Sequence, residues 1–444
     1  IITIIVVVLT TLLTGCTGKE PNEIAYVVAL GIDSTDDDNY KITIQYANTT
    51  QISGGASESG GKAGSEIVDN VTIEAPNIYA GVGLANNIVR KSFSMSHAKL
   101  IVFSKEIAEK GVKDMIETLV RSEEIRPDVF IAVANTTAND YLTSVNPEME
   151  VNPAQYYQLI YQKNQLVGIP DGQLSEFFTG LYTDNYDSIL PVAGVIEGAG
   201  GNSQNDDKGQ SKDGQNEGSE GSSESLDSFE SKSSDDKDEN EKEKDAEKNT
   251  SKYEYDIKNY VGGETAIEKK NKAEAIGAAV FEKDKMVGEL GEVETEICKI
   301  LKGDYTYSYL TYYNNDTPDI PITVKTTQQK KPKYKIDTDK KTVDIELYIE
   351  SDLYSLPADY NVENKIEDFE RDVANYTSSA CTEFINNFTK KYNSDILKLN
   401  EKVKYKFLTN NQYNWFKKNV GWSEYKFSVC TNFKVRRTGL IVRE

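Results

Sequence analysis

Histidine and cysteine, the side chains most often used as transition-metal ligands and activated nucleophiles, are few in this sequence: one histidine and four cysteines in 444 residues. A single histidine, His97, excludes a metal site built on two histidines. Cys298, Cys381 and Cys430 lie far apart, with neither a CxxC pair nor the spacing of a zinc site. We expect them to be scattered structural thiols, with one disulfide as the alternative, and we predict no metal and no cofactor.

The surroundings of His97 do not indicate catalysis. It stands in Met95-Ser96-His97-Ala98, and a serine and a histidine this close along the chain do not suggest a catalytic pair. The sequence contains no GxSxG motif of a nucleophile elbow. Gly81-Val82-Gly83 lacks the third glycine of a dinucleotide-binding loop. We therefore predict no catalytic residue, and we expect a structural hydrogen bond for His97.

Cys16 is the cysteine whose surroundings indicate a chemical modification. Ile1 to Leu13 is an apolar run that is shorter than the roughly 20 residues needed to span a bilayer, and it has the length of a signal-peptide core. Leu13-Thr14-Gly15-Cys16 follows, and it resembles a bacterial lipobox, in which a small residue admits the signal peptidase and the thiol receives lipid. We predict a signal peptide at residues 1–15, with the lipobox at 13–16, and lipidation at Cys16.

Two alternatives to lipidation are an ordinary secretory signal and a buried strand with a chance cysteine. Because the sequence begins at Ile1, without a Met or a basic segment, we expect that a few residues precede it. Acyl chains add about 0.8 kcal/mol of membrane affinity per buried methylene, so a doubly acylated Cys16 would anchor the protein without a transmembrane helix.

The composition limits the partners. A length of 444 residues predicts two or three domains, and 38% hydrophobic residues can supply their cores. The net charge of −22 argues against nucleic-acid binding, because phosphate backbones attract basic surfaces. The same charge argues against electrostatic attraction to anionic lipid, so membrane attachment would depend on the lipid anchor.

One segment divides the chain. From about residue 198 to 252 the sequence is almost entirely Gly, Ser, Asn, Asp, Glu and Lys. Such a segment cannot bury enough apolar surface to offset its chain entropy, so we predict an acidic disordered linker at 198–260. A functional acidic tail is the alternative. The folded parts are then an N-terminal α+β domain at 17–136, a middle module at 137–197 and a C-terminal α+β domain at 261–444.

The N-terminal part alternates strands with helices. Apolar runs and alternation predict strands at Ile24–Ile32, Tyr40–Tyr46, Glu66–Glu74, Ala98–Phe103 and Val129–Ala134. The first two form a hairpin around the acidic turn at 36–39. Helices are predicted from Pro76 to Arg90 and over Ser104–Glu124, the second with a possible break at Gly111. The strand–helix–strand spacing predicts a parallel crossover. The middle module holds short helices rich in Tyr and Phe.

The C-terminal part is dominated by strands and one long helix. Predicted strands are Ala275–Phe281, Met286–Leu290, Tyr305–Tyr313, Pro321–Thr327, Lys333–Ile336, Thr342–Glu350 and Tyr425–Ile441. A helix is predicted over Glu292–Leu301. The helix from about Asn361 to Tyr392 has apolar residues three or four apart, and we expect it to pack across an antiparallel sheet, with a coiled coil as the alternative. In the last strand, Cys430 faces away from the apolar side.

The strand at 305–313 is rich in tyrosine. Tyrosine is common in half-buried sheets, which is the reading we favour, and a sugar-stacking platform is the alternative.

Several motifs, in order along the chain, resemble the Ger(x)C family of spore germination lipoproteins, the C subunits of nutrient germinant receptors. They are the lipobox, Glu23-Ile24, Gly31-Ile32-Asp33, Ser96-His97, Ile101-Val102-Phe103, Ile107-Ala108-Glu109-Lys110-Gly111, Leu119-Val120-Arg121, the segment 275–281, Val287-Gly288-Glu289-Leu290, Glu294-Thr295, Asp395, Trp415, Trp422 and Gly439.

The resemblance implies an α+β, three-domain extracytoplasmic body: a mixed sheet with a crossover helix in the N-terminal part, and an antiparallel sheet packed on one long helix in the C-terminal part. It implies a non-enzymatic lipoprotein on the outer face of the spore inner membrane. The partners would be two multispanning membrane subunits, one of them permease-like. Nutrient binding is usually credited to the permease-like subunit, so this chain would have a structural or coupling role.

Two other functional classes are weighed against this one. A solute-binding lipoprotein that serves a transporter also has a lipobox and a large body, but it has two α/β lobes with repeated crossovers. A cell-wall hydrolase needs a paired acid or a metal site, and no acid pair stands out in this acidic sequence.

Overall fold

The computed structural model describes residues 23–37, 39–47, 68–145, 153–162, 168–183, 185–196, 259–265, 271–313, 321–355, 365–392 and 394–437. The predicted signal peptide, Cys16 and residues 198–258 of the predicted linker lie outside these ranges. All described residues belong to one unit, formed by Ile1–Ala199 together with Lys258–Glu444.

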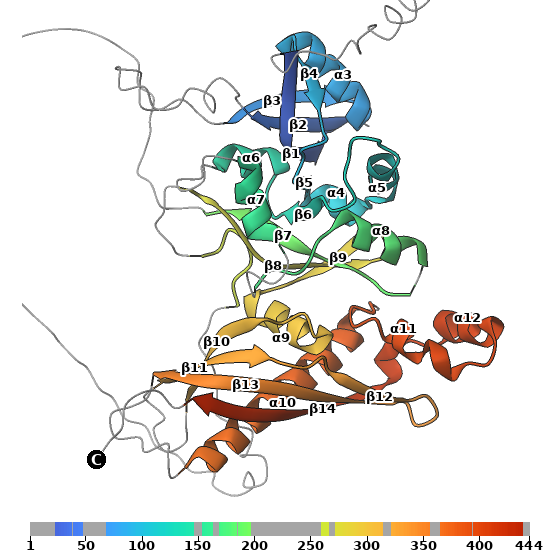
Figure 1. Ribbon diagram of the computed structural model, residues 1–444. Helices are drawn as coiled ribbons and strands as arrows, with labels where there is room; N and C mark the ends of the chain where they lie inside the picture. Colours follow the sequence, from blue (N-terminus) through green and yellow to red (C-terminus); the bar gives the residue numbers. More distant parts are fainter. Residues whose placement is uncertain are drawn as a thin grey trace, which may run out of the picture. The chain divides into compact units, whose positions relative to one another are not determined.

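A first sheet combines a parallel centre with antiparallel flanks (Figure 1). Its strands are β1 (Ile24–Ser34), β2 (Tyr40–Ala47), β3 (Val68–Ala75), β4 (Ser92–Ser94), β5 (Leu100–Ser104), β6 (Phe130–Ala134), β7 (Ile189–Val195), β8 (Ala273–Glu282) and β9 (Lys285–Leu290). Their order is β3-β2-β1-β5-β6-β7-β8-β9, and β4 pairs with the start of β1. Strands β1, β5, β6 and β7 run parallel, whereas β1–β2–β3 and β7–β8–β9 are antiparallel.

The predicted parallel crossover is confirmed between β5 and β6. The chain between them forms α4 (Lys105–Lys110) and α5 (Lys113–Val120), with the predicted break at Gly111. Gly111 has a φ of +124°, which residues with a Cβ rarely adopt. The break thus has a local cause, and it lets the two short helices take different directions.

Helices cover both faces of the first sheet, so its central strands are buried on both sides. In β5, Ile101 and Phe103 pack in the cluster that includes residues of α3 (Ile78–Val89), α4, α5 and α8 (Leu174–Thr183). Leu100 and Val102 pack in the opposite cluster, with α6 (Ala138–Ser144) and α7 (Pro153–Tyr161). The alternation of side chains along a strand therefore assigns each helix to a face.

The motif Gly31-Ile32-Asp33 positions α6. A Cβ on Gly31 would lie 3.0 Å from Leu142 and 3.1 Å from Ala138, both on α6, so glycine permits a close approach of helix and strand. The buried Asp33 carboxylate accepts the backbone N–H groups of Ala138 (2.6 Å) and Asn139 (3.0 Å). These donors belong to the unsatisfied first turn of the helix, so β1 both seats and caps α6.

A second sheet forms from the C-terminal part of the chain. Its strands are β10 (Tyr307–Tyr313), β11 (Pro321–Gln328), β12 (Lys333–Asp337), β13 (Thr342–Ser355) and β14 (Lys426–Arg437). The order is β10-β11-β13-β12, all antiparallel, and β14 pairs with β13. The pairing of β13 with β14 is parallel, so the predicted antiparallel sheet ends in one parallel pair. The chain reaches β14 from a crossover that contains the long helix, which explains the direction.

Among the remaining helices of the described residues, α9 (Glu292–Lys302) precedes β10 and the others lie between β13 and β14 in the chain. The others are α10 (Ile366–Lys391), α11 (Leu399–Val403), η2 (Lys404–Lys406), α12 (Asn410–Asn419) and η3 (Trp422–Glu424). The predicted long helix is confirmed as α10, which crosses one face of the second sheet (Figure 1). Its Phe369, Val373 and Phe388 share a core with inward residues of β13 and β14. No coiled-coil partner is needed to explain its apolar stripe.

Strand pairing divides the chain differently from the predicted domains. The hairpin β8–β9 lies within the predicted C-terminal domain at 261–444, yet it extends the first sheet by pairing with β7. Strand β7, from the predicted middle module at 137–197, also belongs to that sheet. Strands β7 and β8 are hydrogen-bonded neighbours in the sheet, although the segment 198–260 separates them in the sequence.

Candidate functional site

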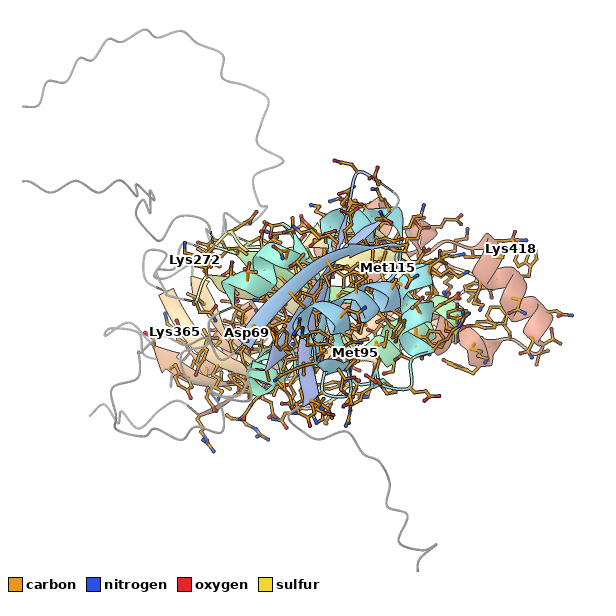
Figure 2. The ribbon with its side chains drawn as sticks, turned by 90° about the horizontal axis from the view of Figure 1, so that it is seen from above. Asp69, Met95, Met115, Lys272, Lys365 and Lys418 are labelled. Atoms are coloured by element: carbon orange, nitrogen blue, oxygen red, sulfur yellow. The ribbon has the colours of Figure 1, made fainter. Side chains whose placement is uncertain are left out.

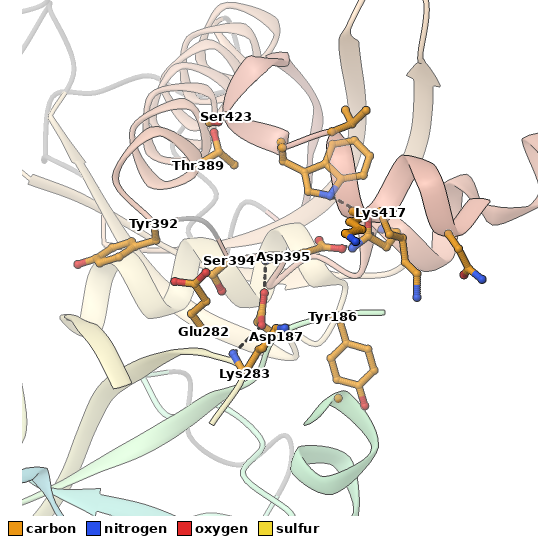
Figure 3. A pocket seen from close by; sticks show the side chains of 17 residues that line it. Tyr186, Asp187, Glu282, Lys283, Thr389, Tyr392, Ser394, Asp395, Lys417 and Ser423 are labelled. Atoms are coloured by element: carbon orange, nitrogen blue, oxygen red, sulfur yellow. Dashed lines mark hydrogen bonds between the residues drawn. The ribbon is translucent and has the colours of Figure 1, made fainter. Parts of the chain in front are cut away.

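A polar cavity of about 600 Å³ lies between residues next to the first sheet and the segment from the end of α10 to η3 (Figure 3). The part of the chain that precedes β7 and the β8–β9 turn line one side, with Tyr186, Asp187, Glu282 and Lys283. The end of α10 and the segment through η3 line the other, with side chains that include Thr389, Tyr392, Ser394, Asp395, Asn400, Lys417, Lys418 and Trp422. Residues more than 200 positions apart in the chain meet there.

Asp187 joins three segments at the cavity. Its Oδ1 accepts the backbone N–H of Lys283 (2.9 Å), and its Oδ2 accepts the backbone N–H of Asp395 (2.8 Å). The backbone N–H of Asp187 in turn donates to the carbonyl of Asp395 (3.2 Å). Figure 3 shows Asp187 between these two partners. Burial raises the pKa of the Asp187 carboxyl, although both backbone bonds oppose the shift.

Asp395 organises the chain that follows α10. Its two carboxylate oxygens accept the backbone N–H groups of Leu399 and Asn400, both at 2.8 Å, at the start of α11. Lys398, which directly precedes Leu399, has a φ of +57°. The carboxyl group is buried, and this burial raises its pKa to about 7 against the two backbone bonds, which lower it. Asp187 and Asp395 together form what we call the aspartate joint.

Further hydrogen bonds hold the two sides of the cavity together. Ser394 Oγ donates to the carbonyl of Phe281 (3.0 Å), and Lys417 Nζ donates to the carbonyl of Thr183 (3.3 Å). Lys398 pairs with Glu176 of α8 at 2.8 Å, with both side chains mostly buried. Polar groups from each side are thus already bonded across the boundary.

An apolar core continues beneath this polar layer. Ile189, Val280 and Leu290 of the first sheet belong to the same buried cluster as Phe388 and the residues around α10. The two sheets therefore share a core, and a motion of one would require repacking of the other.

The indole of Trp422 forms part of one wall of the cavity. It is 7% exposed, its Nε1 donates to Asn400 Oδ1 (3.1 Å), and its ring contacts Phe416 and Tyr425 at centroid distances of 5.8 and 4.8 Å. Asp395 and Trp422 were both among the motif residues in the sequence. Asp187 and Lys417 were not, because neither stands in a local pattern that distinguishes it from the other acids and lysines of the chain.

The residues that the sequence singled out for chemistry lie elsewhere. Cys16 is outside the described residues. His97 is exposed, bonds to Ser96 Oγ (3.0 Å) and packs edge-on against Tyr26; within the described ranges no carboxylate bonds to its ring. Cys298, Cys381 and Cys430 are free thiols. Burial raises the pKa of Cys298 to about 11 and that of Cys381 to about 12, so both thiols stay protonated.

The tyrosine-rich strand is only partly buried. Tyr305 is buried, whereas Tyr307 and Tyr309 of β10 are exposed on the face opposite α10, where the ring of Tyr309 contacts that of Tyr354. Among the described residues, no group of three or more His, Cys, Asp or Glu side chains could hold a metal ion. In the same part of the chain, no helix combines the length and apolar character needed to cross a bilayer.

Comparison with known proteins gives matches to both parts of the chain. Residues 18–195 match the family described as "Spore germination protein N-terminal domain", and residues 276–439 match "Spore germination B3/ GerAC like, C-terminal". Together the two matches cover more than half of the chain, in the order expected from the sequence motifs.

Individual relatives are more distant. Spore germination protein KC of Bacillus subtilis is 28% identical over 162 residues, which cover 33% of this chain and 40% of that protein. Spore germination protein B3 of the same organism is 26% identical over 148 residues, covering 31% and 36%. In both cases the chain spans less than half the length of the curated relative.

Among solved structures, that of the GerBC protein aligns over 91% of this chain and 96% of its own, with 15% identity and a TM-score of 0.49. The two domain matches decide the assignment: the chain belongs to the spore germination B3/GerAC family.

Proposed function

We propose that this protein is a lipid-anchored, non-enzymatic subunit of a spore germinant-receptor complex, needed for the initiation of germination. The observation that carries the proposal is the match of both parts of the chain to domains of spore germination proteins. Cys16 would carry the lipid, on the outer face of the spore inner membrane. The partners would be two multispanning membrane subunits, one of them permease-like.

The geometry of the cavity supports a coupling role for such a subunit. The aspartate joint and the shared apolar core connect the two sheets, so a displacement at one would be felt at the other. The carboxylates of Asp187 and Asp395 accept backbone N–H groups. Among the described residues that line the cavity there is neither a histidine nor a cysteine.

A gene deletion tests this proposal. Spores that lack the protein should form normally but fail to respond to one class of nutrient, and the wild-type gene supplied in trans should restore the response. The deletion is best made in a strain without related receptor genes, because a paralogue could compensate. A normal response to every germinant in that strain would contradict the proposal.

A solute-binding lipoprotein is the second candidate, and the cavity is the observation that favours it. A volume of about 600 Å³ is within the range of small-molecule sites. Against it stands the second sheet, which is mostly antiparallel with one long helix, unlike the lobes of solute-binding proteins. Calorimetry of the full chain with amino acids and sugars separates the two: tight one-to-one binding would favour the solute-binding reading.

A further inference from the structure

The segment 398–426, which contains α11, η2, α12 and η3, is positively charged within an acidic protein. It holds seven lysines and two glutamates, while the whole chain has a net charge of −22. The lysines are Lys398, Lys402, Lys404, Lys406, Lys417, Lys418 and Lys426. The negative net charge of the whole chain argued against attraction to anionic lipid. This segment nevertheless has a local excess of positive charge.

Most of these lysines form no salt bridge with another described residue. Lys398 pairs with Glu176, but no carboxylate among the described residues lies within salt-bridge distance of Lys404, Lys406 or Lys418. Lys406 donates to the carbonyl of Ile336, and its charge also acts on the nearby carboxylate of Asp337. Figure 2 shows Lys418 on α12. The charges thus remain available to an anionic partner.

The same segment exposes large apolar side chains. Leu408 is 94% exposed, Tyr405 79% and Trp415 65%. Their neighbours are packed: the ring of Phe407 contacts those of Tyr413 and Phe416 at 5.8 and 5.0 Å, which holds η2 against α12. The exposed residues therefore belong to a well-packed element, and they are not the loose end of a core.

Lysines beside exposed tryptophan, tyrosine and leucine are typical of surfaces that rest on a bilayer. The ring of Trp or Tyr suits the boundary between headgroups and acyl chains, and each lysine near an anionic surface adds about 1 kcal/mol. We propose that this surface docks on an anionic bilayer; it consists of Lys404, Tyr405, Lys406, Leu408, Trp415 and Lys418.

The inference rests on the proposed function, in which Cys16 keeps the protein at a membrane. The chain's own acidic segment is a weaker candidate for this surface. Residues 198–252 have the complementary charge, but Leu226 and Phe229 are their only large apolar residues. That segment would leave most of the apolar surface in water, whereas a bilayer satisfies the lysines and the apolar side chains together.

Tryptophan fluorescence of the full lipidated chain tests the docking. The protein has two tryptophans, of which Trp415 is exposed and Trp422 is buried. The chain is inserted into vesicles of brominated phosphatidylcholine, with and without brominated phosphatidylglycerol. Docking predicts quenching of Trp415 and a blue shift of its emission in the anionic vesicles. Trp415→Phe should remove both effects, while the emission of Trp422 reports an intact fold.

Lysine variants test the electrostatic part. Changing Lys404, Lys406 and Lys418 to Gln should lower the docked-to-undocked ratio by about fivefold for each lysine, roughly a hundredfold in all. The matched control changes three other exposed lysines, Lys330, Lys331 and Lys335, to Gln and should leave the quenching unchanged.

The outcomes separate this inference from the lipid anchor. If the chain floats with both vesicle types while Trp415 stays unquenched, the anchor stands and the docking is overturned. If the chain floats only with anionic vesicles and salt releases it, the anchor is contradicted and the docking is supported. If the emission of Trp415 shifts to the blue only when the partner subunits are added, the docking on lipid is overturned and the surface is assigned to a protein contact.

Discussion

Two buried aspartates show how single residues organise this fold. Asp33 accepts two backbone N–H groups at the start of α6, and Asp395 accepts two at the start of α11. Both carboxyl groups are buried, and burial raises the pKa of each. Asp33 links β1 to α6, and Asp395 links the end of α10 to α11, so both act as caps on helices that are otherwise too short to be stable alone.

The raised pKa of Asp395 predicts a pH dependence of stability. The carboxyl has a pKa of about 7 in the folded protein against an ordinary 3.8, so the unfolded chain loses its proton first as the pH rises. The contribution of Asp395 is therefore fully present below about pH 4 and is lost as the pH rises to about 7, by at most about 4 kcal/mol. Urea denaturation at several pH values should show this decline.

Asp395→Asn should flatten that pH dependence, because the amide does not titrate. It should also cost about 1–3 kcal/mol at low pH, since one of the two backbone donors loses its acceptor. The control is Asp339→Asn, at an exposed turn, which should leave the profile unchanged. An identical slope in the Asp395→Asn variant and the wild type would show that another group titrates.

Cys16→Ala is the corresponding test of the lipid anchor. The change should abolish lipidation and processing by the lipoprotein peptidase, and leave the fold unaltered, because Cys16 precedes β1. Membrane fractionation of spores with and without the partner subunits measures the effect. A high-salt wash is included, since the basic surface would give only weak, salt-sensitive retention. A variant that remains fully membrane-bound after the wash, without partners, would show that Cys16 is not the anchor.

At the scale of elements, α10 protects the edge of the second sheet. Side chains spaced four residues apart on α10 bind backbone groups of β14 at every second residue. Asn386 accepts from Phe427 N–H (3.1 Å), Thr382 from Val429 (3.0 Å), Ser378 from Thr431 (2.9 Å) and Glu370 from Val435 (2.8 Å).

The two spacings match because four helical residues rise about 6 Å and two strand residues about 6.6 Å. The helix thereby satisfies an edge that could otherwise pair with another chain. Ala374 stands where the next polar side chain of this row would be, opposite Phe433.

Substitutions along this row predict graded effects on stability. Ser378→Ala should cost about 1 kcal/mol, because the N–H of Thr431 loses its acceptor. Ala374→Ser should stabilise by up to about 1 kcal/mol if its hydroxyl reaches the N–H of Phe433. Ser379→Ala, on the exposed side of the same helix, is the matched control. Chemical denaturation measures the stability of all three variants. Equal effects of Ser378→Ala and Ser379→Ala would contradict a stabilising role of these hydrogen bonds between α10 and β14.

At the scale of the whole molecule, a long insertion, residues 196–272, separates two neighbouring strands of the first sheet in the sequence. Strands β7 and β8 are antiparallel neighbours, and Val195 pairs directly with Ala273. The ends of the insertion are therefore close together. Its last part is tied to the sheet, because Gly262 N–H donates to the carbonyl of Ile276 (2.9 Å) and Asn135 donates to the carbonyl of Gly262.

Replacing residues 200–256 by a short Gly/Ser loop should leave the fold intact. A shorter loop closes at a lower entropic cost, so the thermal midpoint should be unchanged or slightly higher. Extending the excision to residue 270 removes the contacts of Gly262 and should lower the thermal midpoint. Calorimetry of the two variants provides the comparison, and loss of cooperative unfolding in the shorter excision would refute the prediction.

The sequence by itself indicated most of the strands and the long helix with its buried face, but not β4, β7 or the short helices α11 and α12. The break at Gly111 and the stripe of α10 depend on local backbone geometry and on the spacing of apolar residues, which any part of a chain displays without its partners. The order of the motifs also indicated the family to which both parts of the chain were matched.

Tertiary structure alone decided which elements meet. The pairing of β7 with β8 across the insertion, the parallel direction of β14 and the contact of Asp187 with Asp395 join residues far apart in the chain. No local pattern encodes these pairings, because an unpaired strand edge or a carboxylate acquires its partner only when the chain has folded. The basic surface likewise emerged only when η2 and α12 packed together, since the net charge of the chain has the opposite sign.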